Sequence, residues 1–283
     1  MKTAFLLGAG ASKDAGLPLA DELTGKVLKN EFGILDSAKN RPYQPLDLKS
    51  TSQTVAQGIL PFLRWIKVQV ECAGTSDNHV PNYEDFAYVA VQIRDHLRGE
   101  FDNPAVHPLI QRALSELWPL LPGELHSCLE ELREIADATV KYISAVTRQA
   151  VSHWGGNLDY FQFLIEVPPR YNEGALNIFT LNNDVLVEQF LLKSGKSFID
   201  GFDPPLPAAE GRWKPALFEQ SAGADTARLF KLHGSINWLR CRRPAKSRRD
   251  KFLRIGPHDP CAGVKPGIGA CRVVFKRRQI RVV

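Results

Sequence analysis

The feature that most constrains the fold of this chain is an apolar run near its start that ends abruptly in glycines. Residues 3–7 have the apolar continuity of a short buried strand, and residues 8–16 read Gly-Ala-Gly-Ala-Ser-Lys-Asp-Ala-Gly. Pro18 suits the first residue of a helix, and apolar residues then recur every four positions at Leu19, Leu23 and Val27. We therefore predict a strand, a glycine loop and a helix within residues 1–34.

The glycine loop is a candidate phosphate cradle. Glycines let a backbone approach a pyrophosphate closely, and the free N–H groups of a helix start attract its charge. The candidate binding residues are Gly8, Ala9, Gly10, Ala11, Ser12 and Gly16. The dinucleotide fingerprint has a third glycine three residues after the second, where this chain has Lys13. An ordinary tight turn is the alternative interpretation.

The middle of the chain has helical periodicity only. Apolar residues keep a helical spacing at Phe86, Val89, Ala90 and Ile93, and again at Leu125, Cys128, Leu129, Leu132, Ile135 and Ala136. Between residues 33 and 166 we find no strand pattern, so residues 35–165 are predicted to form an α-helical insertion.

Strand character returns after this insertion. Residues 175–180 and 228–232 read as buried strands, and residues 185–192 read as a helix ended by Gly195. Beyond Trp238 the pattern decays into basic, Pro- and Gly-rich sequence, with one last strand-like fragment at 271–275. We expect an α/β fold in which a Rossmann-like parallel sheet is built from residues 1–34 and 166–283.

Polar residues follow the strand at 175–180. Ligands of open α/β sheets bind at the carboxyl ends of strands. Thr180, Asn182 and Asp184 lie there, and amide and carboxylate groups can hold ribose hydroxyls and a carboxamide. A turn or a helix cap is the alternative, because Asn and Asp favour both.

A histidine follows the strand at 228–232. His233 precedes Gly234 and Ser235, and an imidazole is the side chain that most often serves as a general base. A structural histidine is the alternative. We treat His233 as the candidate base, with Gly234 and Ser235 as candidate cofactor contacts.

The cysteines exclude some classes of protein. Their number is odd and no two are spaced Cys-x-x-Cys, which argues against a disulfide framework or a structural zinc and for a reduced compartment. A loose metal site formed with a histidine stays open for Cys241, Cys261 and Cys271. No apolar run reaches the roughly 20 residues that span a bilayer, and the apolar start is too short for a signal peptide, so we expect a cytoplasmic protein with no membrane partner.

Charge is distributed unevenly along the chain. Residues 239–283 hold 14 of the 36 Lys and Arg residues but 2 of the 31 Asp and Glu residues, a local charge of +12 against +5 for the whole chain. Such a basic tail on an acidic body can meet nucleic acid or an acidic partner. A solvated tail is the alternative.

Taken together and in order, the motifs at 8–18, 180–184 and 232–235 resemble those of the sirtuin superfamily. The version at 231–238, Lys-Leu-His-Gly-Ser-Ile-Asn-Trp, is most similar to bacterial SIR2-like proteins of antiphage defence. Asn82-Tyr-Glu-Asp-Phe, at the start of an expected helix, is also similar to those proteins but less specific.

The resemblance implies a role for each matching residue. Gly8, Ala9, Gly10 and Ser12 would wrap the phosphates of NAD. Asn182 would contact the nicotinamide ribose, Asp184 would hold the carboxamide, and His233 would be the base. The implied activity is cleavage of NAD, as substrate, at its nicotinamide–ribose bond, with NAD depletion as the defence output.

Departures from the family refine this expectation. The sirtuin Gly-Ile-Pro-Asp-Phe-Arg segment is Gly-Leu-Pro-Leu-Ala-Asp at 16–21, and the zinc ribbon is missing, so we expect neither protein deacetylation nor zinc. The late Gly-x-Ser loop over the adenosine half has no good match, with 267–269 a poor candidate. We therefore expect a truncated form, or a site completed by a homo-oligomer or by a partner of ATPase or Argonaute type.

Two other functions stay open. A hydride-transferring oxidoreductase would need an acidic residue about 20 positions after the loop at the end of a second strand. That distance falls inside the expected helix near residues 29–31. The second is a catalytically silent subunit that senses NAD or ADP-ribose, or associates with nucleic acid.

Overall fold

The computed structural model divides into two compact units, one formed by Met1–Leu19 with Val151–Val283 and the other by Ala20–Ala150. The structure describes residues 4–35, 51–73, 80–100, 103–120, 129–152, 156–166, 176–203, 210–220, 223, 225–236, 238–241, 251–255 and 271–273. We call the unit formed by Met1–Leu19 with Val151–Val283 the sheet unit, and the unit formed by Ala20–Ala150 the helical unit.

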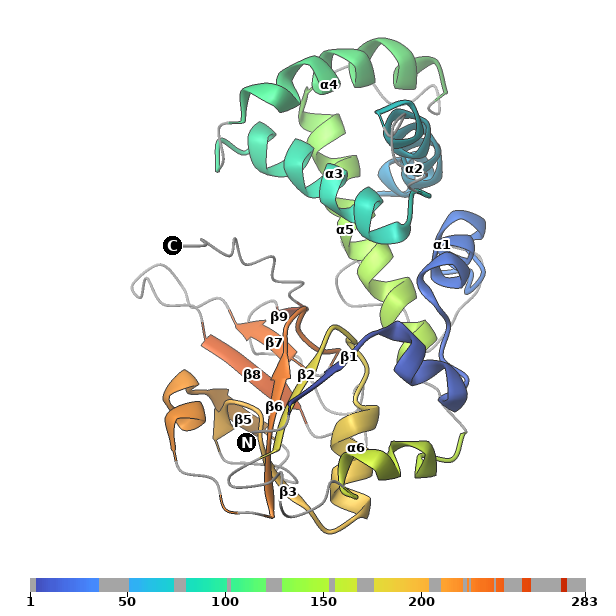
Figure 1. Ribbon diagram of the computed structural model, residues 1–283. Helices are drawn as coiled ribbons and strands as arrows, with labels where there is room; N and C mark the ends of the chain where they lie inside the picture. The colour runs from blue at the N-terminus through green and yellow to red at the C-terminus, as the bar shows by residue number, and fades with distance from the viewer. Residues whose placement is uncertain are drawn as a thin grey trace. The chain divides into compact units, whose positions relative to one another are not determined.

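The sheet unit contains a four-stranded sheet in which every pair of neighbours is parallel. Its order is β1 (Ala4–Leu7), β2 (Leu176–Thr180), β6 (Thr226–Lys231) and β3 (Ser197–Ile199). The predicted strands at 3–7, 175–180 and 228–232 are thus β1, β2 and β6. The expected α/β fold with a parallel sheet is confirmed at this level (Figure 1).

Side chains alternate between the two faces of this sheet because successive residues of a strand point in opposite directions. One face buries Ile178 and Leu229 against Leu186 and Phe190 of α6 (Leu186–Lys193) and against η5 (Asp159–Leu164). On the other face Phe179 stacks on Phe230 with ring centroids 4.6 Å apart. The predicted helix at 185–192 is therefore α6, held by its apolar face.

A second, five-stranded sheet was missed by the sequence patterns. Its order is β4 (Phe202–Asp203), β5 (Glu210–Trp213), β8 (Lys251–Ile255), β7 (Trp238–Cys241) and β9 (Cys271–Val273). All its pairs are antiparallel. The strand expected at 271–275 is β9, whereas β7 and β8 lie where the pattern had seemed to decay, because short strands rich in basic residues lack apolar continuity.

Aromatic rings hold the start of this second sheet. Phe202 packs on Trp213 and Trp238 with ring centroids 5.1 Å away in each case. Gly201 has a φ of 83°, and a Cβ there would lie 2.3 Å from the Trp213 ring. Glycine is therefore required at this position by both conformation and space.

All the regular secondary structure in the described residues of the helical unit is helical. They are α1 (Ala20–Lys29), α2 (Gln53–Ala73), α3 (Tyr83–Leu97), η2 (Pro104–Val106), α4 (His107–Arg112), the π-turn η3 (Ala113–Leu117), η4 (Trp118–Leu120) and α5 (Leu129–Ser152). They share one apolar core that includes Phe62, Phe86 and Ile135. No strand lies among these described residues, as expected for the insertion, but residues 151–165, which we had assigned to the insertion, belong to the sheet unit because Phe161 and Leu164 pack in its core.

The first helix belongs to the helical unit, although we had expected residues 1–34 to stay with the sheet. Leu23 and Val27 lie in the helical core. Tyr142 Oη also donates a 2.7 Å hydrogen bond to the Val27 carbonyl, and Tyr83 N donates to Thr24 Oγ1 at 3.0 Å. The division falls after Leu19 because the apolar face of α1 packs on α2, α3 and α5 residues.

Local signals in the helical unit behave as expected. Asn82 starts α3 with a capping box: its side chain accepts from Glu84 N at 2.8 Å, and its own N–H donates to Asp85 Oδ2 at 2.9 Å. The helical segment predicted from the Asn82-Tyr-Glu-Asp-Phe motif is thereby confirmed.

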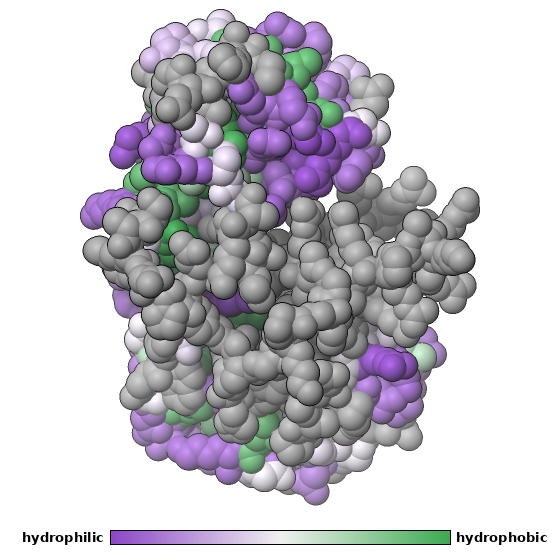
Figure 2. All heavy atoms as spheres, turned by 180° about the vertical axis from the view of Figure 1, so that it is seen from behind, coloured by the Kyte–Doolittle hydropathy of each residue, from purple (hydrophilic) through white to green (hydrophobic). Residues whose placement is uncertain are grey.

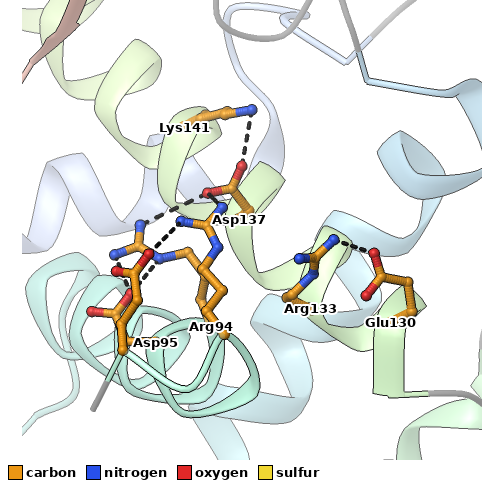
Figure 3. Close-up of polar contacts among 8 residues, drawn as sticks. Arg94, Asp95, Glu130, Arg133, Asp137 and Lys141 are labelled. Atoms are coloured by element: carbon orange, nitrogen blue, oxygen red, sulfur yellow. Dashed lines mark hydrogen bonds and ion pairs between the residues drawn. The ribbon is translucent and has the colours of Figure 1, made fainter. Parts of the chain in front are cut away.

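An ion-pair network joins α3 to α5 (Figure 3). Asp137 of α5 lies 2.9 Å from Arg98 and 3.0 Å from Lys141, while Arg94 contacts Asp95 at 2.7 Å.

The side of the helical unit seen in Figure 2 is largely hydrophilic. Within the described segments, no helix has both the length and the apolar character needed to cross a bilayer.

Candidate functional site

Three loops leave the parallel sheet side by side. β1, β2 and β6 pair in register, so Leu7, Thr180 and Lys231 end their strands at the same edge. Leu181 N donates to the Leu7 carbonyl at 3.0 Å, and Leu232 N donates to the Thr180 carbonyl at 2.9 Å. The glycine loop, the loop after β2 and the loop after β6 therefore start as neighbours.

The glycine loop is a 3-10 helix, η1 (Ala9–Ala15), and not the start of an α-helix. Ala11 N donates to the Gly8 carbonyl at 2.9 Å, and Ala11 is half-buried. Gly16 ends the turn with a φ of 81°, where glycine is favoured. The α-helix that we predicted directly after this loop begins at Ala20.

Gly8 and Gly10 are glycines that the fold itself does not require. Both are exposed, neither has a positive φ, and a Cβ built on either meets no atom within 4 Å. Ala9 beside them is exposed as well. The loop therefore presents bare, accessible backbone at the sheet edge.

A hydrogen-bonded cluster ties this loop to the loop after β2. Ser12 Oγ donates to Asp184 Oδ2 at 2.6 Å. Asn182 Nδ2 donates to Ser12 Oγ at 2.7 Å and to the Gly8 carbonyl at 2.9 Å. Ser12 and Asp184 are buried, at 5% and 7% exposure, so this cluster is a constructed part of the fold.

Asp184 and Thr180 also stabilise their own loop. Leu186 N donates to Asp184 Oδ1 at 3.0 Å, and Asn182 N donates to Thr180 Oγ1 at 3.0 Å. Both carboxylate oxygens of Asp184 thus have protein donors, which is the capping role that the sequence left open. Asn182 Oδ1 accepts no hydrogen bond from the described part of the chain.

The loop after β6 contains an exposed histidine, His233, and two buried residues, Ser235 and Ile236, that bind the loop after β2. Ser235 Oγ donates to the Asn183 carbonyl at 3.2 Å, and Ile236 N donates to the same oxygen at 2.8 Å. Gly234 has a φ of 99°, which favours glycine. His233 is exposed, and its ring is hydrogen-bonded to none of the described residues. His233 thus lies at the same edge of the sheet as the glycine loop and the loop after β2.

A buried ion pair beneath these loops was missed by the sequence analysis. Lys231 Nζ lies 2.9 Å from Glu188 Oε1, with side chains 1% and 2% exposed. Burial raises the pKa of the Glu188 carboxyl, and the nearby Lys231 ammonium opposes that shift. The available signal was a charged residue among the apolar residues of α6, next to Val187 and before Phe190.

Tyr160 of η5 is a second residue that sequence reasoning missed. Its hydroxyl is buried and has no hydrogen-bond partner among the described residues. Burial, and then the charges of Asp184 and Asp14, raise the pKa of this phenol to about 12. The segment before it packs against the glycine loop, since a Cβ on Gly156 would lie 2.8 Å from Ala15 Cα.

Among the described residues, no group of three or more His, Cys, Asp or Glu side chains is placed so that it could hold a metal ion. The side chains of Cys241, Cys261 and Cys271 lie outside those residues, as do the fragment 267–269 and most of the basic tail.

No protein-family model and no curated protein matches this chain.

Proposed function

We propose that this chain binds NAD at the carboxyl edge of its parallel sheet and hydrolyses the bond between nicotinamide and ribose. The observation that carries the proposal is the hydrogen-bonded cluster of Asn182 with the buried Ser12 and Asp184, which joins the glycine loop to the loop after β2 at that edge. Ligands of open α/β sheets bind at this edge. The order of the motifs, which resembles that of SIR2-like proteins, supports NAD as the ligand.

The glycine loop suits the pyrophosphate. Gly8 and Gly10 leave open space that side chains would fill, although neither glycine is required by the conformation or packing of the chain. A ligand that approaches the backbone closely explains such glycines.

Asn182 and His233 suit the reacting end. Asn182 is held through its amide nitrogen, so Oδ1 is left to accept a ribose hydroxyl. When the C1′–N bond breaks, its electron pair leaves with nicotinamide, and water adds its oxygen to C1′. His233 accepts the proton that this water loses, and the products are nicotinamide and ADP-ribose.

A second candidate is binding without turnover. Asp184 is 7% exposed, and its two carboxylate oxygens already accept hydrogen bonds from Ser12 and Leu186, so this carboxylate has a role within the chain that needs no carboxamide. A subunit that senses NAD or ADP-ribose would retain this arrangement.

Chromatography of NAD incubated with the purified protein, across protein concentration and with and without candidate partners, tests these alternatives. Release of nicotinamide and ADP-ribose without NADH supports hydrolysis. NADH formation would indicate an oxidoreductase. Saturable binding of NAD with no product would favour the silent subunit, and absence of both binding and cleavage would refute the proposal.

A further inference from the structure

We propose that Lys231 and Glu188 form a buried positioning pair that holds the loop after β2 against the loop after β6. Lys231 is the last residue of β6, and Glu188 lies in the first turn of α6. The pair thus connects the strand that leads to His233 with the helix that follows Asp184.

The ammonium of Lys231 has two partners in the interior. It donates to Glu188 Oε1 at 2.9 Å and also to the backbone carbonyl of Asp184. The hydrogen bond from Lys231 to the Asp184 carbonyl holds the main chain of the loop after β2 in place, which is more than the balance of a buried charge requires.

From this carbonyl, contacts continue to the glycine loop. The Asp184 side chain accepts from Ser12, and Ser12 accepts from Asn182. A chain of direct contacts therefore runs from Glu188 through Lys231, Asp184 and Ser12 to Asn182. A displacement of Lys231 would be transmitted to residues at the exposed edge of the sheet.

Stability alone explains this pair poorly. Taking both charges out of water costs more than their attraction commonly returns, and apolar side chains of similar size often pack as well or better. Glu188 Oε2 also has no hydrogen-bond partner in the described part of the chain. The feature that an apolar pair cannot reproduce is the hydrogen bond to Asp184.

Lys231 does not itself touch a ligand in this arrangement. Its side chain is 1% exposed, and its amine is directed at Glu188 and Asp184. Lys231 and Glu188 are therefore positioning residues, which act through Asp184.

The test uses a double variant, Lys231→Met with Glu188→Leu, in the full chain. Lys231→Met alone leaves the buried Glu188 carboxylate without its partner and should lower the melting temperature strongly. The double variant should recover most of that loss. Lys231→Met with Glu188→Met serves as a second apolar pair. Lys196→Met is the matched control, because Lys196 pairs with the exposed Asp225 in the same unit.

The decisive readout is amide hydrogen exchange, which needs no activity. Leu186 N and Ile236 N donate to Asp184 Oδ1 and to the Asn183 carbonyl. In the double variant we expect their exchange to accelerate about tenfold or more while the amide of Ile178 in β2 stays protected. Lys196→Met should leave the exchange of both amides unchanged.

A catalytic readout rests on the proposed function. If the wild type cleaves NAD, the double variant should lose about tenfold or more in kcat with a smaller change in KM, because misplacement acts on the reacting geometry. A wild type without cleavage would remove the proposed function but leave the exchange result standing. Wild-type exchange at Leu186 and Ile236 in a folded double variant would overturn the positioning pair, as would failure of both double variants to fold.

Discussion

Ser12 Oγ donates a 2.6 Å hydrogen bond to Asp184 Oδ2, although 172 positions separate the two residues in sequence. This bond joins the first strand–loop unit of the chain to the loop after β2, across the whole helical unit in sequence. Because both residues are buried, the glycine loop and the β2 loop are held as one structure.

Ser12→Ala should therefore destabilise the protein. It removes a donor to the buried Asp184 carboxylate and an acceptor for Asn182, and a loss of about 1–3 kcal/mol is expected for a buried group left with too few partners. Denaturant unfolding measures the change. Ser197→Ala is the control, since the exposed Ser197 hydroxyl contacts Thr226 at the surface, and it should stay within about 0.5 kcal/mol of wild type.

The three glycines of the loop should respond differently to alanine. Gly8→Ala and Gly10→Ala meet no atom of the chain, so stability should be maintained or rise by up to about 1 kcal/mol, while NAD binding weakens. Gly16→Ala forces a residue with φ of 81° into a strained conformation and should cost about 1–2 kcal/mol. Thermal unfolding and calorimetric titration with NAD separate the two effects. Unchanged NAD affinity in both Gly8→Ala and Gly10→Ala would contradict a phosphate role.

Asn182→Ala should lower turnover more than it weakens NAD binding. Its contact with the ribose would matter most as positive charge develops on C1′. The same change also removes the hydrogen bonds to Gly8 and Ser12, so unfolding must be measured in parallel. Equal losses in binding and turnover would make Asn182 a uniform binder of NAD.

His233→Ala should reduce nicotinamide release by roughly 100-fold, the usual contribution of a general base. The fold should be unaffected, because His233 is exposed and its ring is hydrogen-bonded to no described residue. His107→Ala, at an exposed histidine of the helical unit, is the control and should leave release unchanged. Equal release by His233→Ala and wild type would remove His233 from the mechanism.

NAD cleavage should depend on assembly. The proposed function rests on a resemblance to SIR2-like proteins, and the late Gly-x-Ser motif expected from that resemblance has no good match in this sequence. On the proposed function, a second copy or a partner is therefore expected to close the site and exclude water. Rates measured across protein concentration, with sizing in parallel, should rise with oligomer content. Full specific activity in a dilute monomer would show that no assembly is needed.

The sequence by itself determined the elements whose signals are local. The apolar runs at β1, β2 and β6, the apolar segment that became α6 and the helix start at Asn82 were readable because each depends on residues close together in the chain. The placement of Asn182 and His233 on one edge followed from a single added rule, that parallel strands end together.

Only the tertiary structure decided which distant residues meet. α1 reads as a helix in either unit, and the packing of Leu23 and Val27 assigns it to the helical core. β7 and β8 are strands because antiparallel partners complete their hydrogen bonds. That pairing leaves no apolar pattern in the sequence from which it could be predicted. The sequence does not show that Lys231 pairs with Glu188, or Ser12 with Asp184, because these contacts form only when folding buries the four side chains. Burial then makes each contact specific, and burial is a property of the whole fold rather than of any segment.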